Sequence, residues 1–179
     1  KIADTARHAI PEQASAINAY EFVQQALAFW WVSRNEIEYT LRAADGANAE
    51  LIKHCVIQVD FNLRSSLCNI FENAALASLA NNAPRLDVLL AFENTNTLLI
   101  HIDDYGIGIA DSLLDKLGNQ AITHSQQGMG MGLTLANATI ERLGGHLTIK
   151  NRNNGSRNTI ALPYIIKRQS TNNEHRVQG

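Results

Sequence analysis

The stretch Gln127–Leu135, QGMGMGLTL, carries three glycines at every second position. This spacing gives the backbone room to turn tightly and to approach a ligand closely. The glycines lead into a helical pattern, with apolar residues at Leu133, Ala136, Ile140 and Leu143. The first turn of such a helix offers free N–H groups and the positive end of the helix dipole, which suit phosphate. Taken alone, the pattern fits a flexible loop before an ordinary amphipathic helix equally well.

Two further stretches combine polar side chains with helix or turn patterns. Asn69–Ala75 reads NIFENAA within a helical pattern, and Ile102–Ile109 reads IDDYGIGI at the end of a β-like run. In chain order, the three stretches read N-x-x-x-N-A, D-x-G-x-G-I and G-x-G-x-G-L. This series resembles the N, G1 and G2 boxes of the Bergerat-fold ATP-binding family, which includes gyrase, Hsp90, the mismatch-repair ATPases and the histidine kinases. The resemblance covers roughly residues 17–165 and implies an ATP-binding domain.

The composition fits one soluble globular domain. The chain has 179 residues, of which 45% are hydrophobic and 18% are charged. Its formal net charge is −2 and it has no dense run of Lys or Arg, so nucleic acid is not an expected partner. The two cysteines, Cys55 and Cys68, lack metal-binding spacing and are expected to be small buried residues. We find no secretory signal and no run of roughly 18 apolar residues that would span a membrane.

Periodicity predicts three substantial helices and several strands. Apolar residues at helical spacing predict helices over 20–32, over 61–81 and from the glycines to Leu143. Residues 50–54 fit a short helical turn. Alternating patterns predict strands over 35–42, 55–60, 87–93, 97–103, 146–151 and 158–162. Pro163 is expected to close the last strand, and short turns predict hairpins for the last two pairs of strands.

This order of elements predicts an α+β fold: a two-layer α/β sandwich with one mixed, largely antiparallel sheet and three helices on one face. The resemblance implies the same architecture, the Bergerat fold. The irregular polar segment 110–127, between two glycine motifs, is expected to form an ATP lid. We expect residues 1–16 to be a linker or the end of a dimerisation helix, 17–165 the catalytic ATP-binding domain, and 166–179 a polar C-terminal tail.

Asn69 distinguishes two kinds of chemistry within the family. The ATP-hydrolysing branches resemble one another in carrying Glu four residues before the second asparagine of the N box, as general base for water. Here that residue is Asn69, and an amide cannot take a proton from water. Glu72 is close in sequence but points about 100° around the helix from Asn73. The residues therefore argue against a dedicated hydrolase.

Asparagine at this position is what sensor histidine kinases carry, and the region after the third box agrees. The chain continues with ERLGGHL at 141–147, NGS at 154–156 and LP at 162–163. This pattern resembles the catalytic ATP-binding domain of sensor histidine kinases. Within that group, ENA at 72–74 and GMG at 128–130 are similar to the redox-responsive RegB/PrrB-type sensors. A dinucleotide-binding motif fails on spacing, since G-x-G-x-G is not G-x-G-x-x-G.

The resemblance implies a role for each matching residue. Asp104 would accept a hydrogen bond from the adenine amino group, and Asn73 would hold Mg²⁺ through its amide oxygen. Asn69 and Glu72 are the candidate catalytic residues, and Asn69 would support the phosphates or the metal. The glycines would shape the base pocket and let the helix meet the phosphates. The candidate ATP-binding residues are Asn69, Asn73, Asp104, Gly106, Gly108, Lys116, Thr123, Gly128, Gly130, Gly132, Leu133 and Ser156.

The resemblance also implies partners for the domain. Transfer of the γ-phosphoryl group of ATP needs positioning and charge neutralisation more than covalent help. Its acceptor would be a His on a separate dimerisation domain of the same kinase, with a response regulator downstream. His8 lacks the acidic neighbour and the proline spacing of such an acceptor, so we expect a plain surface histidine. The domain is expected to be cytoplasmic, in a parent anchored in the inner membrane.

Two departures from the kinase pattern keep an alternative open. Leu76 stands where many histidine kinases have Lys or Arg, and the segment 110–127 contains no arginine or phenylalanine. Lys116, Thr123 and His124 are the nearby candidates for contacts with the γ-phosphate. The phosphate charge would then be less well matched. The alternative is a degenerate Bergerat-fold module that binds nucleotide, or has lost it, and acts through protein contacts without kinase activity.

Overall fold

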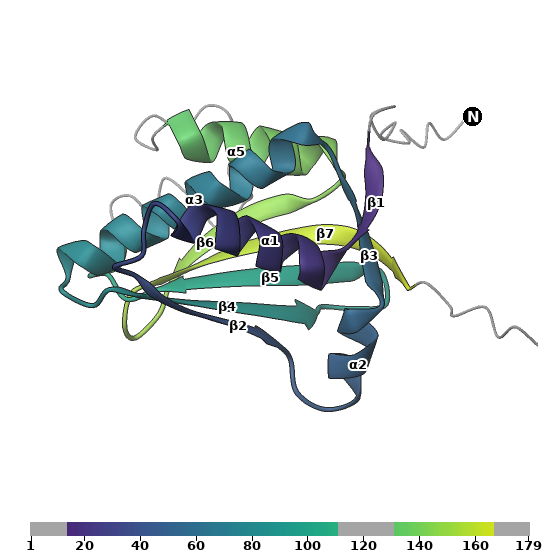
Figure 1. Ribbon diagram of the computed structural model, residues 1–179, viewed down its shortest axis with the longest axis horizontal. Helices are drawn as coiled ribbons and strands as arrows, with labels where there is room; N and C mark the ends of the chain where they lie inside the picture. The colour runs from purple at the N-terminus through teal and green to yellow at the C-terminus, as the bar shows by residue number, and fades with distance from the viewer. Residues whose placement is uncertain (1–13, 111–130, 167–179) are drawn as a thin grey trace, which may run out of the picture.

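The structure is a computed structural model that describes residues 14–110 and 131–166 (Figure 1). The described helices are α1 (Ala19–Trp31), α2 (Ala47–Lys53), α3 (Phe61–Ala80) and α5 (Met131–Arg142). The described strands are β1 (Ser15–Asn18), β2 (Glu38–Ala43), β3 (Cys55–Val59), β4 (Arg85–Phe92), β5 (Thr97–Asp104), β6 (His146–Asn151) and β7 (Ser156–Ile166). Most of the expected linker, nearly all of the expected lid, the first two glycines of the third box and the polar tail lie outside the described residues.

The described strands form one mixed sheet. Their order is β1-β3-β7-β5-β4-β2, and β6 pairs with β7. The parallel pair is β2 with β4, and the other pairings are antiparallel. The hairpins β4–β5 and β6–β7 are those predicted from the sequence. Helices α1, α3 and α5 lie together on one face of the sheet (Figure 1), which confirms the predicted α+β two-layer sandwich.

Alternation along the strands places one side of the sheet against these helices. On β5, Leu98, Ile100 and Ile102 are fully buried, whereas the residues between them are only partly buried. Between the layers, Phe71 of α3 is fully buried and its ring centroid lies 5.7 Å from that of Trp30 in α1. Burying a side chain of this size contributes roughly 1.5–3 kcal/mol. The core therefore holds α3 against the sheet, in one layer with α1 and α5 (Figure 1).

Asp60 caps α3 and ties it to α5. One carboxylate oxygen accepts hydrogen bonds from the N–H groups of Asn62 and Leu63, each at 3.0 Å, which is an N-cap arrangement. The other oxygen accepts hydrogen bonds from the guanidinium of Arg142, in the last turn of α5. The start of α3 therefore lies beside the end of α5.

Two element boundaries near the N-terminus differ from the predicted ones. The strand β1 was not expected, because four residues are too few to show an alternating pattern. It pairs along β3 and extends the folded unit to Ser15. The strand expected over 35–42 begins only at Glu38, since residues 35–37 form a turn.

The last strand also runs further than its proline suggested. β7 continues through Pro163 to Ile166. Pro163 falls in the gap between the pairing with β6, which reaches Ala161, and the pairing with β3, which begins at Tyr164. It also lies opposite the first residue of β5. The missing N–H of the proline therefore leaves these ladders intact.

Two expectations from composition concern the thiols and membrane spans. Cys55 and Cys68 are both free. Cys55 is fully buried, and burial raises the pKa of its thiol to about 12. Burial also raises the pKa of the partly buried Cys68. Among the described helices, none is long and apolar enough to cross a membrane.

Candidate functional site

Asp104 is the last residue of β5, and its carboxylate is held by the backbone and by one hydroxyl. It is 2% exposed. Its Oδ1 accepts hydrogen bonds from the N–H of Gly106 at 2.9 Å and of Ser156 at 3.0 Å, and its Oδ2 accepts one from the Ser156 hydroxyl. An ionised carboxylate has about four acceptor positions. Asp104 is therefore fixed in direction and keeps acceptor capacity for a ligand.

The loop that follows Asp104 packs too closely for side chains at its glycines. A Cβ on Gly106 would lie 2.9 Å from the Cβ of Ala77 and 3.0 Å from its carbonyl oxygen. Gly108 has φ +81°, a left-handed conformation that favours glycine, and a Cβ there would lie 2.9 Å from Oδ1 of Asn151. The loop is therefore held between α3 and the end of β6.

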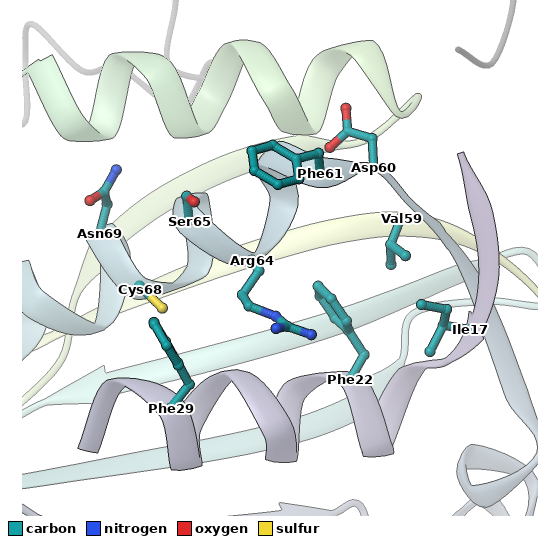
Figure 2. A pocket seen from close by; sticks show the side chains of 10 residues that line it. All are labelled: Ile17, Phe22, Phe29, Val59, Asp60, Phe61, Arg64, Ser65, Cys68 and Asn69. Carbon is teal, nitrogen blue, oxygen red and sulfur yellow. The ribbon is translucent and has the colours of Figure 1, made fainter. Parts of the chain in front are cut away.

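One face of α3 connects this loop with the glycine-led helix α5. Asn69, Asn73 and Ala77 follow each other at intervals of four residues, so they share that face. A Cβ on Gly132, in the first turn of α5, would lie 3.6 Å from the Cβ of Asn69. Figure 2 shows the Asn69 side chain pointing from α3 toward α5. The face thus runs from α5 at Asn69, past the exposed Asn73, to the Gly106 loop at Ala77, about 12 Å along the helix axis.

Glu72 lies on a different side of α3, and the structure does not bring it to this face. Its carboxylate accepts hydrogen bonds from Nε of Arg34 at 3.0 Å and from Nε1 of Trp30 at 3.1 Å. The hydrogen bond from Arg34 lowers the pKa of Glu72, and the same pair raises the pKa of Arg34. This geometry does not favour a catalytic role for Glu72, which stays a prediction. Its partners come from α1 and the turn after it, which the helical spacing of α3 does not indicate.

The remaining candidates fall into two groups. Ser156 is buried beside Asp104, as described above. The side chain of Leu133, at the start of α5, is half-buried and packs against the core. The candidates outside the described residues are Lys116, Thr123, Gly128 and Gly130.

Several residues that support the site were missed in the sequence. Gly155 sits so close to Asp104 that a Cβ on it would lie 2.1 Å from the Asp104 carbonyl oxygen. The N–H of Tyr105 donates a hydrogen bond to the hydroxyl of Ser78 at 2.9 Å, and its carbonyl accepts one from Asn81 at 2.8 Å. These partners are distant in sequence, and the only local signal was the turn composition around Gly155.

The Tyr105 side chain belongs to a charged cluster on the other side of the sheet. Its hydroxyl donates a hydrogen bond to Asp87, which raises the pKa of Tyr105. The guanidinium groups of Arg85 and Arg152 lie 5.1 and 5.9 Å from the centroid of its ring. Burial opposes ionisation of Asp87, but hydrogen bonds from Tyr105, Thr40 and Arg85 lower its pKa overall. The cluster therefore holds Tyr105, the residue next to Asp104, from the side of the sheet that faces away from the helices.

The protein groups near Asn73 suit a cation that is coordinated mainly by the oxygens of a bound ligand and only weakly by the protein. Within residues 14–110 and 131–166, no group of three or more His, Cys, Asp or Glu side chains is placed to hold a metal ion. The exposed Asn73 amide oxygen is a single hard donor. Mg²⁺ usually takes one or two protein ligands and completes its shell with waters and phosphate oxygens. The face of α3 is therefore compatible with Mg²⁺ bound together with a polyphosphate.

The fold and this face define a class of protein, a two-layer α+β nucleotide-binding domain. Comparison with known proteins gives the family. The chain matches the family described as histidine kinase-, DNA gyrase B-, and HSP90-like ATPase over residues 59–166. This chain belongs to that family, and ATP binding is the property that its members share by description.

Similar curated proteins are a sporulation kinase and a sensor protein. Sporulation kinase B of Bacillus subtilis (strain 168) is 28% identical over 102 residues, which are 56% of this chain and 23% of that protein. The sensor protein FixL of Bradyrhizobium diazoefficiens is 24% identical over 144 residues, which are 80% of this chain and 28% of that protein. The chain thus spans about a quarter of the length of these relatives.

Similar solved structures are those of histidine kinases. The catalytic domain of histidine kinase ThkA superposes with a TM-score of 0.62 at 18% identity, covering 84% of this chain and 95% of that one. The mycobacterial sensor histidine kinase MprB gives 0.63 at 20% identity, covering 86% and 99%. The predicted resemblance to histidine kinase catalytic domains is confirmed, whereas the RegB/PrrB-type subgroup stays a prediction.

Proposed function

We propose that this chain is the ATP-binding catalytic domain of a sensor histidine kinase. It would transfer the γ-phosphoryl group of ATP to a His side chain on a separate dimerisation domain. The observation that carries the proposal is the α3 face of Asn69, Asn73 and Ala77, with α5 at one end and the Gly106 loop at the other. A nucleotide along this face would meet a fixed carboxylate at its base end and a helix N-terminus at its phosphate end.

Each end of the face has a chemistry that suits one part of ATP. Asp104 accepts hydrogen bonds only, so it favours a base with an exocyclic amino group, as in adenine. Asn69 and the first turn of α5 supply amide and backbone donors for phosphate oxygens. Asn73 would hold Mg²⁺, which neutralises phosphate charge as the γ-phosphoryl group moves from the β-phosphate oxygen to the acceptor imidazole nitrogen.

Kinase activity is favoured over ATP hydrolysis by the residues on α3. A hydrolase needs a base that takes a proton from the attacking water. Asn69 is an amide, and the Glu72 carboxylate is held by Arg34 and Trp30 on the side toward α1. Neither side chain is available as that base. An imidazole acceptor brings its own nucleophilic nitrogen, so a transferase does not require one.

The larger context belongs to the same proposal. Residues 17–165 would be the catalytic domain, with 1–16 a linker or the end of a dimerisation helix and 166–179 a polar tail. The partners would be the phosphoacceptor His domain of the same kinase and a response regulator. The domain would work in the cytoplasm, in a parent anchored in the inner membrane.

Binding and transfer can be tested in sequence. Calorimetric titration of ATP with and without Mg²⁺ should show saturable binding that requires Mg²⁺ for full affinity. The Asn73→Ala domain should lose the Mg²⁺-dependent part, because the amide oxygen is its single protein ligand in the proposal. Incubation with radiolabelled ATP and a supplied phosphoacceptor His domain should then label that domain. Steady phosphate release from this chain alone, without an acceptor, would instead support a hydrolase.

A second candidate function is favoured by one side chain. Leu76 is 48% exposed on α3, at the position where many histidine kinases carry Lys or Arg. This apolar exposure would suit protein contact better than phosphate binding. The alternative is a degenerate module that acts through protein contacts without kinase activity. Absence of ATP binding at millimolar concentration, in a domain that unfolds cooperatively, would bring this alternative to the front.

A further inference from the structure

Asn151, the last residue of β6, makes a two-point contact with the backbone of Ile109. Its Oδ1 accepts a hydrogen bond from the Ile109 N–H at 2.7 Å, and its Nδ2 donates one to the Ile109 carbonyl at 2.8 Å. The amide therefore pairs with this residue as a neighbouring strand would. Ile109 lies five residues after Asp104, beyond the end of β5. The contact thus extends sheet-like hydrogen bonding beyond β5 into the loop that follows it.

The same amide fills the space next to Gly108. A Cβ on Gly108 would lie 2.9 Å from Oδ1 of Asn151, closer than real Cβ contacts. Gly108 also has φ +81°, so the backbone turns sharply just before Ile109. The turn and the Asn151 amide fit each other, and each constrains the other. The glycine is therefore needed for close approach as well as for its dihedral angle.

The hairpin that carries Asn151 also holds the other end of the loop. Gly155 packs against the carbonyl of Asp104, and Ser156 donates two hydrogen bonds to the Asp104 carboxylate. The turn between β6 and β7 is closed by a hydrogen bond from the Arg152 N–H to the Gly155 carbonyl at 2.9 Å. One hairpin therefore contacts both Asp104 and Ile109.

We propose that Asn151 is a positioning residue for the base pocket. By pairing with Ile109 it would fix the loop of residues 106–109 relative to Asp104, so that a purine base meets a preformed wall. This inference rests on the proposed function. Asparagine suits the role because the contact needs one donor and one acceptor on a short side chain. Aspartate keeps only the acceptor, and alanine keeps neither.

Three variants separate this role from general stability. Asn151→Ala should weaken ATP and ADP binding by the same factor, about tenfold, because the loss lies at the base end that both ligands share. Asn151→Asp should weaken binding at least as much as Asn151→Ala, since it keeps the bond to the Ile109 N–H but sets a carboxylate oxygen against the Ile109 carbonyl. Asn153→Ala, an exposed asparagine in the turn of the same hairpin, is the matched control and should bind as wild type. The melting temperature should stay within a few degrees, because Asn151 is exposed.

Hydrogen exchange adds a readout that does not need nucleotide. In Asn151→Ala, the Ile109 amide should exchange faster than in wild type, whereas amides within β5 should be unchanged. Equal ATP affinity for wild type and Asn151→Ala, with wild type binding normally, would overturn the positioning role alone. Failure of wild type itself to bind ATP would overturn the proposed function, which distinguishes the two failures. Unequal losses for ATP and ADP would place the effect at the phosphates and would also contradict the inference.

Discussion

Helix α3 has two sides of opposite character. The side toward α5 and the Gly106 loop carries Asn69, Asn73 and Ala77, with Asn69 beside Gly132 and Ala77 against Gly106. The side toward α1 carries the fully buried Phe71 and, next to it, Glu72 bonded to α1. In Figure 2, Asn69 points toward α5, whereas Cys68 and Arg64 lie on the side that faces α1.

A single helix therefore has one side that forms part of the candidate site and another side that packs against α1 and stabilises the fold. On the first side, the exposed side chains of Asn69 and Asn73 are aligned at four-residue spacing. On the second side, a groove of about 580 Å³ between α1 and α3 shares only Asn69 with the candidate site. Glu72, the neighbour of Asn73 in sequence, is bonded to Trp30 and Arg34 on the side toward α1. Adjacent positions on a helix can therefore serve unrelated purposes, and only long-range contacts reveal which.

The largest expected effect tests the carboxylate at the base end of the site. Asp104→Asn should weaken ATP binding about 100-fold, because a carboxylate oxygen is replaced by an amide nitrogen that donates instead of accepting. The fold should persist, since the amide oxygen can still accept from the Gly106 and Ser156 N–H groups. Titration calorimetry and circular dichroism would measure both. Wild-type affinity in the variant would remove Asp104 from the site.

A smaller effect is expected where the loop touches α3, and it differs between two glycines of the boxes. Gly106→Ala should weaken ATP binding about tenfold, since its Cβ would lie 3.0 Å from the backbone carbonyl of Ala77 and push the loop away. Gly132→Ala should change affinity by less than about threefold, because the Cβ would meet Asn69 at 3.6 Å, an ordinary contact. Equal losses in the two variants would show that the packing difference is irrelevant to binding.

Substitutions on the side of α3 that packs against α1 should change the stability of the fold and leave ATP affinity unchanged. Glu72→Gln should lower the melting temperature by a few degrees at pH 7, because the Arg34–Glu72 pair is only about one-third exposed. The pKa of Glu72 is lowered in the folded state, so the ion pair stabilises fully above the ordinary value of 4.5 and is lost as pH falls through the folded value. The difference in melting temperature between wild type and Glu72→Gln should therefore shrink below about pH 4.5. A constant difference down to pH 3 would contradict the ion pair.

Much of the fold was predictable because its signals are local. The helix over 61–81 and the hairpin of 87–93 with 97–103 follow from apolar periodicity and short turns, and the structure has them within about two residues. The strand β1 was not predictable, since its SAIN sequence has no pattern and it forms by pairing with β3. The end of β7 was predicted wrongly at Pro163 for a related reason. Whether a proline ends a strand depends on whether a neighbouring strand needs its N–H, and the sequence does not show which strand lies there.

The site was predictable only where the spacing of residues in the sequence determines which side chains lie together. Four-residue spacing puts Asn69 and Asn73 on one face, and the Asp-glycine order puts Asp104 at a turn. The sequence did not indicate that Arg34 would take Glu72, or that Asn151 would hold Ile109 from 42 residues away. Such contacts are set by the packing of distant elements, which no local pattern encodes.

The most direct test compares the two sides of α3 in one titration. ATP with Mg²⁺ is titrated into wild type, Asn73→Ala and Glu72→Gln, each checked for cooperative unfolding. We expect saturable binding by wild type, loss of the Mg²⁺-dependent binding in Asn73→Ala, and wild-type affinity in Glu72→Gln. The opposite pattern, with Asn73→Ala binding normally and Glu72→Gln failing, would contradict the division of α3 into a side that forms part of the site and a side that stabilises the fold.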